Sequence, residues 1–141
     1  MKPVVGYVPG AFDLFHIGHL NILRRAALGC DRLIAGVVTD EVLLGAKGHP
    51  AVVPLEERMD IVGSIACVDE VVVDLSSDKF LMWQRLGFDV LFKGDDWKGT
   101  PKGDRLERDL GAVGVGVVYF PYTPHTSSTA LRGLIAGSGI S

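Results

Sequence analysis

Short runs of apolar, mostly β-branched residues recur along the chain and alternate with longer segments whose apolar positions follow helical spacing. Such runs are typical of strands that are covered on both faces, because neither face then needs polar side chains. Strands and helices in alternation indicate a parallel sheet with helices on both faces. The predicted strands cover residues 4–8, 32–39, 70–73, 90–93 and 115–120.

The helical segments are marked by residues typical of helix ends and by the helical spacing of their apolar positions. Leu23 and Ala27 fall on one side of a helix over residues 19–28, and Gly29 is its stop. Pro54 opens another helix, with two glutamates in the first turn. Further helices are predicted over residues 78–86, 104–110 and from 128 or 129 to 136.

These elements predict a Rossmann-like α/β fold with a five-stranded, mostly parallel sheet. We expect one domain over residues 1–136 and a flexible tail over 137–141. A length of 141 residues fits one domain, and 48% hydrophobic residues are enough for a sizeable core. The longest irregular stretches are 45–53, 94–103 and 121–127, and loops in such folds carry functional groups.

Charge and cysteine content exclude several classes of protein. Fourteen basic against seventeen acidic residues give a formal net charge of −3, so we expect binding to neither nucleic acid nor a membrane. Cys30 and Cys67 lack the spacing of a zinc site or a redox pair, and we expect reduced thiols in the core. No apolar stretch has the length of a membrane span, which favours a cytoplasmic protein.

Residues 10–19, GAFDLFHIGH, lie between the first predicted strand and the first predicted helix. Ligands of open α/β sheets bind at this edge, where a helix N-terminus offers free N–H groups to an anion. His16 and His19 can face one side, and Gly18 lets a phosphate approach the backbone closely. Two histidines can also stand at an ordinary helix start, but H-x-G-H in this position favours a phosphate site.

The motif resembles that of the nucleotidyltransferase superfamily, whose members transfer a nucleotidyl group to a phosphorylated acceptor. Class I aminoacyl-tRNA synthetases share these letters, but a single domain without a tRNA-binding module argues against that activity. A second match, KGDDWKG at residues 93–99, is close to the G-D-D-W of glycerol-3-phosphate cytidylyltransferases. Asp95 can accept hydrogen bonds from a base or a polyol, and Trp97 offers an apolar face.

The resemblance implies roles for particular residues. Contact with the reacting phosphates is implied for His16, His19, Lys47 and Arg58, with Lys47 in a mobile loop that closes on the substrate. Asp13 and Asp40 stand at strand ends, where the family places acidic residues that contact metal or ribose. Nucleotide binding is implied for Gly10, Ala11, Phe12, Asp13, Gly18, Asp40, Gly94, Asp95, Trp97, Ser127, Ser128 and Thr129.

Residues 122–129, YTPHTSST, are similar to the R-T-E-G-I-S-T-T of the family, which precedes the last helix. Hydroxyl and N–H groups there can hold the β- and γ-phosphates of a nucleotide. Tyr122 replaces the family's arginine and His125 its glycine, so we expect both to bind substrate in a reshaped acceptor site. A tyrosine carries no permanent charge, and Arg132 and His125 are candidates for the missing phosphate contact.

These features predict transfer of CMP from CTP to a small phosphorylated or phosphonate acceptor such as glycerol 3-phosphate, with release of pyrophosphate. Mg²⁺ is the expected cofactor, held mainly by the nucleotide phosphates, because the sequence contains no carboxylate cage. A homodimer is expected, because the family's proteins are commonly dimers. The alternatives are an adenylyltransferase acting on phosphopantetheine, nicotinamide mononucleotide or FMN, and a module that binds nucleotide without catalysis.

Overall fold

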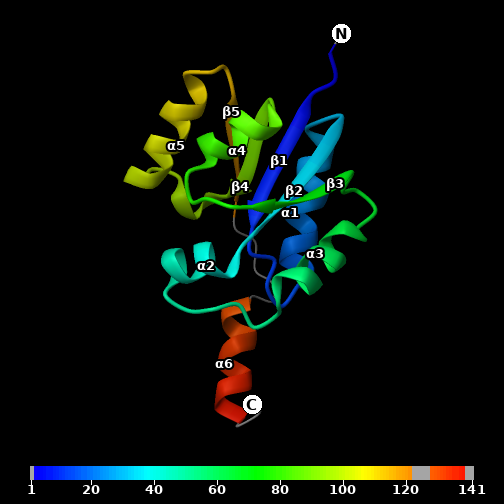
Figure 1. The fold of residues 1–141 in the computed structure, drawn as a ribbon, viewed down its shortest axis with the longest axis vertical. Helices are drawn as coiled ribbons and strands as arrows, with labels where there is room; N and C mark the ends of the chain where they lie inside the picture. Colours follow the sequence, from blue (N-terminus) through cyan, green and yellow to red (C-terminus); the bar gives the residue numbers. More distant parts are fainter. Residues whose placement is uncertain (1, 122–127, 139–141) are drawn as a thin grey trace.

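Five parallel strands form one sheet in the spatial order β3-β2-β1-β4-β5 (Figure 1). The computed structural model describes residues 2–121 and 128–138. β1 runs beside β2, with Val5 opposite Arg32, and beside β4, with Gly6 opposite Val90. The predicted sheet is confirmed, and every described pairing is parallel. The strands are β1 (Val5–Gly10), β2 (Arg32–Val38), β3 (Glu70–Asp74), β4 (Val90–Gly94) and β5 (Gly116–Phe120).

Helices cover both faces of this sheet, as predicted. α1 and α3 contribute to one hydrophobic cluster, and α4 and α5 contribute to the other. α2 and α6 lie beyond the carboxyl ends of the strands, and α6 projects away from the rest of the molecule (Figure 1). The helices are α1 (Ile17–Leu28), α2 (Asp40–Lys47), α3 (Leu55–Gly63), α4 (Lys79–Leu86), α5 (Pro101–Gly111) and α6 (Ser128–Ser138), with a short 3₁₀ helix η1 (Asp95–Trp97).

Three segments that were expected to be irregular are helical instead. α2 continues to Lys47, because the Thr39 hydroxyl accepts a hydrogen bond from the Val42 N–H and Gly48 ends the helix with a φ of 77°. α5 begins three residues early at Pro101, where the Thr100 side chain caps it. α6 extends to Ser138, two residues into the expected tail, and residues 139–141 lie outside the described residues.

A glycine in β2 makes room for a tyrosine side chain that crosses the core to a buried carboxylate. A Cβ at Gly36 would lie 1.9 Å from the hydroxyl oxygen of Tyr7, so only glycine leaves room for that side chain. The Tyr7 hydroxyl donates to the buried Asp74 carboxylate at 2.5 Å. Burial raises the pKa of Tyr7 far above its ordinary value, and the Asp74 charge adds to this. The tyrosine therefore stays a neutral donor and holds Asp74 in place.

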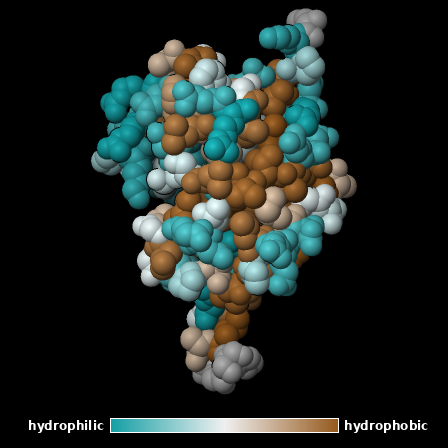
Figure 2. All heavy atoms as spheres, viewed as in Figure 1, coloured by the Kyte–Doolittle hydropathy of each residue, from teal (hydrophilic) through white to brown (hydrophobic). Residues whose placement is uncertain are grey.

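The surface combines polar regions with exposed apolar side chains. Figure 2 shows apolar side chains across the middle of the visible face and along α6. Leu44, Leu75 and Leu134 are among the exposed apolar residues. Cys30 and Cys67 are free and half-buried, and burial raises the pKa of both thiols. None of the described helices has the length and apolar character needed to cross a membrane.

Candidate active site

The predicted motifs converge at the carboxyl edge of the sheet, which is the lower edge of the sheet in Figure 1. β1 has β2 on one side and β4 on the other, so the direction in which the chain adds strands reverses at β1. A reversal of this kind opens a crevice at the carboxyl ends of the strands, where ligands of such sheets bind. The H-x-G-H turn, α2, η1 and the start of α6 all follow strands at this edge.

The two histidines of the motif form a linked pair at the start of α1. The Nδ1 of His16 accepts from the Gly18 N–H at 3.0 Å, and the Nδ1 of His19 accepts from the His16 N–H at 3.2 Å. Their rings stack with centroids 4.0 Å apart. Because Nδ1 is the acceptor in both rings, the proton of each neutral imidazole sits on Nε2. Each neutral imidazole therefore carries its N–H donor on Nε2.

The turn that precedes these histidines is held in an unusual backbone conformation. Phe12 and Leu14 have φ angles of 51° and 52°, in the left-handed region that non-glycine residues rarely adopt. Phe12 is buried and packs edge-on against the His19 ring, with centroids 5.6 Å apart. Aromatic packing and the hydrogen bond from the His16 N–H thus both hold the imidazole, and its donor is positioned before any ligand arrives.

Asp13, within this turn, connects it to the segment before α3 and to α6. Its carboxylate accepts from the Val52 and Val53 N–H groups, both at 2.9 Å, and lies 3.4 Å from the Arg132 guanidinium. Its carbonyl oxygen accepts from the Ser128 hydroxyl at 2.5 Å. The side chain is 2% exposed. Asp13 therefore joins the start of α6 to the segment before α3, and its contact with metal or ribose stays a prediction.

Arg58 occupies a position that the sequence did not indicate. Its side chain is fully buried and donates to the carbonyl oxygens of Ala11, Val38 and Val53 at 2.8–2.9 Å. A fourth bond of 2.7 Å reaches the Asp40 carboxylate, the expected metal or ribose contact, at the start of α2. The guanidinium thus ties the ends of β1 and β2 to α3. Its contact with reacting phosphates stays a prediction, and the hydrogen bonds give it a positioning role.

A cavity of about 320 Å³, called here the smaller cavity, lies next to the histidine turn. It gathers predicted residues from four parts of the chain, and His49 and Lys93 join them there. Arg132, a candidate for the missing phosphate contact, also lines it. The predicted residues that line it are Gly10, Ala11, Phe12, Asp13, His19, Lys47, Gly94, Ser128 and Thr129. His16, Gly18, Asp40, Arg58 and Asp95 are not among its lining residues, and Tyr122, His125 and Ser127 lie outside the described residues.

Lys93 belongs to the site, although the sequence pattern marked it only as the first residue of the KGDDWKG motif. Its ammonium lies 4.3 Å from the centre of the Trp97 ring and 3.4 Å from the Asp96 carboxylate. Burial lowers the pKa of Lys93, Asp96 opposes the shift, and Lys47 and Lys79 add to it. Three lysines from three elements therefore share one region of positive potential. The available signal was its place at the end of β4.

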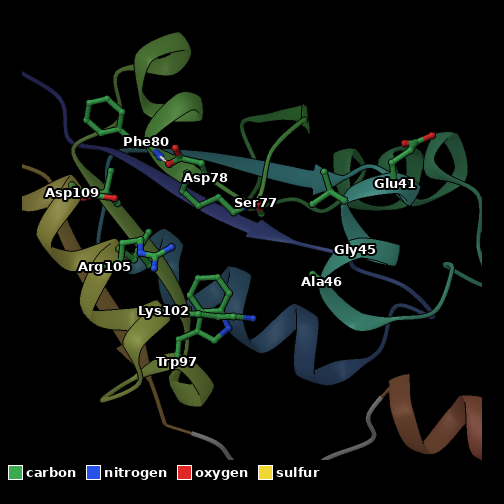
Figure 3. Close-up of a pocket in the computed structure, with 14 residues that line it drawn as sticks. Glu41, Gly45, Ala46, Ser77, Asp78, Phe80, Trp97, Lys102, Arg105 and Asp109 are labelled. Atoms are coloured by element: carbon green, nitrogen blue, oxygen red, sulfur yellow. Dashed lines mark hydrogen bonds between the residues drawn. The ribbon is translucent and has the colours of Figure 1, made fainter.

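A second cavity of about 570 Å³, called here the larger cavity, is lined by residues of α2, α4 and α5 (Figure 3). Gly45 and Ala46 form the α2 wall, where small side chains leave space. Lys102 and Arg105 reach in from α5, and Trp97 lies beside them (Figure 3). Trp97, predicted to bind nucleotide, thus lies in the larger cavity, whereas Gly94 of the same motif lines the smaller one.

Comparison with known proteins shows relatives along most of the chain. A glycerol-3-phosphate cytidylyltransferase from Bacillus spizizenii is 37% identical over 94% of this chain and 95% of its own length. An ethanolamine-phosphate cytidylyltransferase from Arabidopsis thaliana is 40% identical over 72% of this chain, which spans only 25% of that relative. An FAD synthase from Pyrococcus horikoshii is 35% identical over 86% of this chain and 81% of its own length.

The fold has a close counterpart among solved structures. The crystal structure of a lipopolysaccharide core biosynthesis protein from Thermoplasma volcanium superposes with a TM-score of 0.74 over 89% of this chain and 100% of the other. At 18% identity this likeness supports the fold alone. The sequence model described as cytidylyltransferase-like matches residues 7–134, which include the histidine turn, Lys93 and Arg132. The chain therefore belongs to the cytidylyltransferase-like family of nucleotidyltransferase enzymes.

Proposed function

We propose that the protein transfers CMP from CTP to a small phosphorylated or phosphonate acceptor and releases pyrophosphate. The observation that carries the proposal is the pair of cavities that α2 helps to line. The smaller one combines a helix N-terminus, two imidazole donors and several cations, which suits a triphosphate. The larger one has the volume of a small-molecule site and suits the acceptor. Lys93 lies where the two meet, beside Trp97.

In the proposed reaction a phosphate oxygen of the acceptor attacks the α-phosphorus of CTP. The new P–O bond forms as the bond from the α-phosphorus to the β-bridging oxygen breaks, and pyrophosphate leaves with that electron pair. No covalent enzyme intermediate is required, so the enzyme contributes positioning and charge stabilisation. The Nε2–H groups of His16 and His19 would donate to the phosphate oxygens that gain charge. Both donors are fixed before the reaction, which avoids reorganisation in the transition state.

The pyrophosphate end is assigned to the N-terminus of α6. Ser128, Thr129 and Arg132 line the smaller cavity, and the Arg132 guanidinium lies 3.3 Å from the Thr129 hydroxyl. Arg132 thus offers the permanent charge that Tyr122 lacks at the family's arginine position. Lys47 and Lys93 would contact the phosphates of nucleotide and acceptor, and Arg58 would hold the surrounding backbone from behind.

Mg²⁺ is proposed as the accompanying cation, because it neutralises triphosphate charge and orients the leaving group. The described residues contain no group of three or more His, Cys, Asp or Glu side chains arranged to hold a metal ion. They therefore suit an ion that is carried mainly by the phosphates. The protein supplies its own positive charges from Lys47, Lys93 and Arg132.

Adenylyl transfer is the second candidate, because a relative named as an FAD synthase matches most of the chain. The KGDDWKG segment and the two relatives named as cytidylyltransferases favour CTP. Cytosine and uracil present opposite hydrogen-bonding groups, so a site matched to cytosine would leave polar groups unpaired with UTP. We therefore expect CTP to be preferred over ATP, GTP and UTP.

A pyrophosphate-release screen tests both candidates. The purified protein is incubated with Mg²⁺, each of the four nucleoside triphosphates, and a panel of small phosphates, phosphonates and FMN, and the products are identified by mass spectrometry. A CDP-linked product supports the proposal, whereas an adenylylated product assigns the second candidate. His19→Ala should abolish most of the signal, while Arg25→Ala on the exposed side of α1 should not. Tight nucleotide binding without any product would make the chain a binding module.

We also propose that two copies form a homodimer. β3 and β5 are the edge strands of the sheet, and an edge strand presents unpaired backbone groups. The exposed apolar side chains Leu44 and Leu134 add surface that a second copy could cover. Light scattering during size-exclusion chromatography should give twice the mass of the 15.1 kDa chain. A monomeric mass at micromolar concentration would contradict this assignment.

A further inference from the structure

The larger cavity contains a buried ammonium with a donor to spare. Lys79 lines the cavity, is 9% exposed, and donates to the Asp74 carboxylate at 3.0 Å and to the Ser76 carbonyl at 2.9 Å. An ammonium has three N–H donors, and these two oxygens are its hydrogen-bond partners among residues 2–121 and 128–138. Since Asp74 is in turn fixed by Tyr7, the ammonium is held in place. Because Lys79 lines the cavity, we assign its third N–H to a ligand there.

The opposite side of the larger cavity is also basic. Lys102 and Arg105 extend from α5 toward the α2 wall (Figure 3). The Lys102 ammonium lies 5.6 Å from the centre of the Trp97 ring, and Lys93 lies 4.3 Å from it. The only tryptophan of this cavity, among the described residues, is thus already engaged by two cations. A positively charged ligand group would meet like charges where an aromatic ring would otherwise attract it.

Acidic residues offset part of this charge, because Asp74 pairs with Lys79 and three further carboxylates line the larger cavity. The Asp78 carboxylate accepts from the Phe80 N–H at 3.0 Å and caps α4. Glu41 lies on the far rim with its carboxylate turned away from Lys102, and Asp109 lies beyond Arg105 (Figure 3). The space between α2 and α5 therefore faces basic groups from two sides.

We infer that the acceptor carries a second anionic group, a carboxylate or a further phosphate, at the end remote from its attacking phosphate. Lys79, Lys102 and Arg105 would bind this group, while the attacking phosphate faces Lys93 and the smaller cavity. The inference rests on the proposed function, because it takes the larger cavity as the acceptor site. The inference predicts that acceptors with an ammonium group are poor substrates of this protein, although one relative is named as an ethanolamine-phosphate cytidylyltransferase.

Matched acceptors test the charge preference. 3-Phosphoglycerate differs from glycerol 3-phosphate by a carboxylate in place of the distal hydroxymethyl group, and 2-phosphoglycolate has a carboxylate where phosphoethanolamine has an ammonium. In each pair we expect the carboxylate compound to have the higher kcat/KM with CTP, by about tenfold or more, because charge-assisted hydrogen bonds are the strong ones. A higher kcat/KM for phosphoethanolamine or glycerol 3-phosphate than for its carboxylate partner would overturn the inference while leaving nucleotidyl transfer established.

Charge reversal on α5 supplies the second arm. Lys102→Glu and Arg105→Glu should each lower kcat/KM for the carboxylate acceptors by about tenfold, and should leave the KM for CTP unchanged. Arg108→Glu is the matched control, because Arg108 is exposed on the same helix and does not line the cavity. An equal decrease in kcat/KM for all three variants would mean that the change in net charge causes the effect, and it would overturn the inference.

Calorimetry with the same four compounds measures the preference without turnover. We expect 3-phosphoglycerate and 2-phosphoglycolate to bind more tightly than their partners, and Lys102→Glu to remove the difference. Tighter binding of these compounds together with no product from any nucleotide would contradict the proposed function and leave the charge preference standing. Equal binding within both pairs would overturn the inference itself.

Discussion

The two cavities at the carboxyl edge of the sheet differ in the parts of the chain that line them. The smaller cavity is lined by residues at the ends of β1 and β4, in the turn before α1, at the end of α2 and at the start of α6, and several of these segments are tied together through Asp13. The larger cavity is bounded by side chains that project from helices, above all Lys79, Trp97, Lys102 and Arg105. Single substitutions can therefore change what the larger cavity accepts, whereas the smaller cavity depends on conformations that many contacts impose together.

The largest effect is expected at the histidine pair. His19→Ala removes one fixed donor to the phosphates, and kcat should fall roughly 10²- to 10³-fold, as in comparable sites that lose one donor to a developing oxyanion. The loss should be the same with every acceptor, because the donor belongs to the smaller cavity. Circular dichroism should show an unchanged fold. A folded variant with near-normal kcat would contradict the proposed role of His19.

Arg58 tests whether a predicted catalytic residue acts by holding backbone. Arg58→Met leaves three backbone carbonyl oxygens, in one buried and two partly buried positions, without their donor, and the free energy of unfolding should fall by about 3 kcal/mol. Urea denaturation followed by fluorescence measures this. The matched comparison is His19→Ala, which should lose activity at nearly constant stability. If Arg58→Met kept full stability and lost only kcat, Arg58 would be a phosphate contact and no positioning residue.

Arg132 should affect nucleotide binding more than turnover. Arg132→Gln removes a charge near the pyrophosphate end, and the KM for CTP should rise about tenfold with a small change in kcat, because such a contact is present in both ground and transition states. The acceptor KM should stay constant, which separates the two cavities. Steady-state kinetics with each substrate varied in turn measures the difference. Equal increases in both KM values would mean that the cavities are not independent.

Lys93 stands between the cavities, and its effect should appear in the pH profile. A lysine is charged below its pKa, and the pKa of Lys93 is lowered by burial, so the charge is lost as the pH rises through a value below 10.5. The alkaline limb of kcat/KM should therefore begin earlier than for an ordinary lysine. Lys93→Arg keeps its charge and should move that limb to higher pH. If the alkaline limb of kcat/KM stayed at the same pH in Lys93→Arg, the titration would belong to another group.

The smallest effect is expected at Tyr122, which lies outside the described residues. If Tyr122 belongs to the acceptor site, Tyr122→Arg should raise the acceptor KM and leave the KM for CTP almost unchanged. Arg132 already lines the smaller cavity, so a second arginine adds little there. Kinetics of Tyr122→Arg beside Tyr122→Phe measures this. A lower KM for CTP in the arginine variant would place residue 122 at the triphosphate instead.

Local pattern was sufficient for most of the fold and for the location of the site. Buried strands and amphipathic helices leave periodic signals in a few consecutive residues, and the H-x-G-H turn marks a helix N-terminus by itself. α2 is missing from the predicted helices, and its last residues fall in a stretch expected to be irregular, although its Thr39 cap and its Gly48 terminus are local features. Its short length gave the apolar pattern too few turns to stand out against a glycine-rich stretch.

Local sequence was enough to predict the parallel sheet, the helices other than α2, the histidine turn and the family motifs, because each depends on neighbours in the chain. The tertiary structure decided which groups share a space. It buried Arg58 against carbonyl oxygens from three segments, made Asp13 a link to α6, and placed Trp97 in a different cavity from His19. These facts depend on contacts between residues tens of positions apart, and such contacts exist only after the strands have paired and the helices have packed.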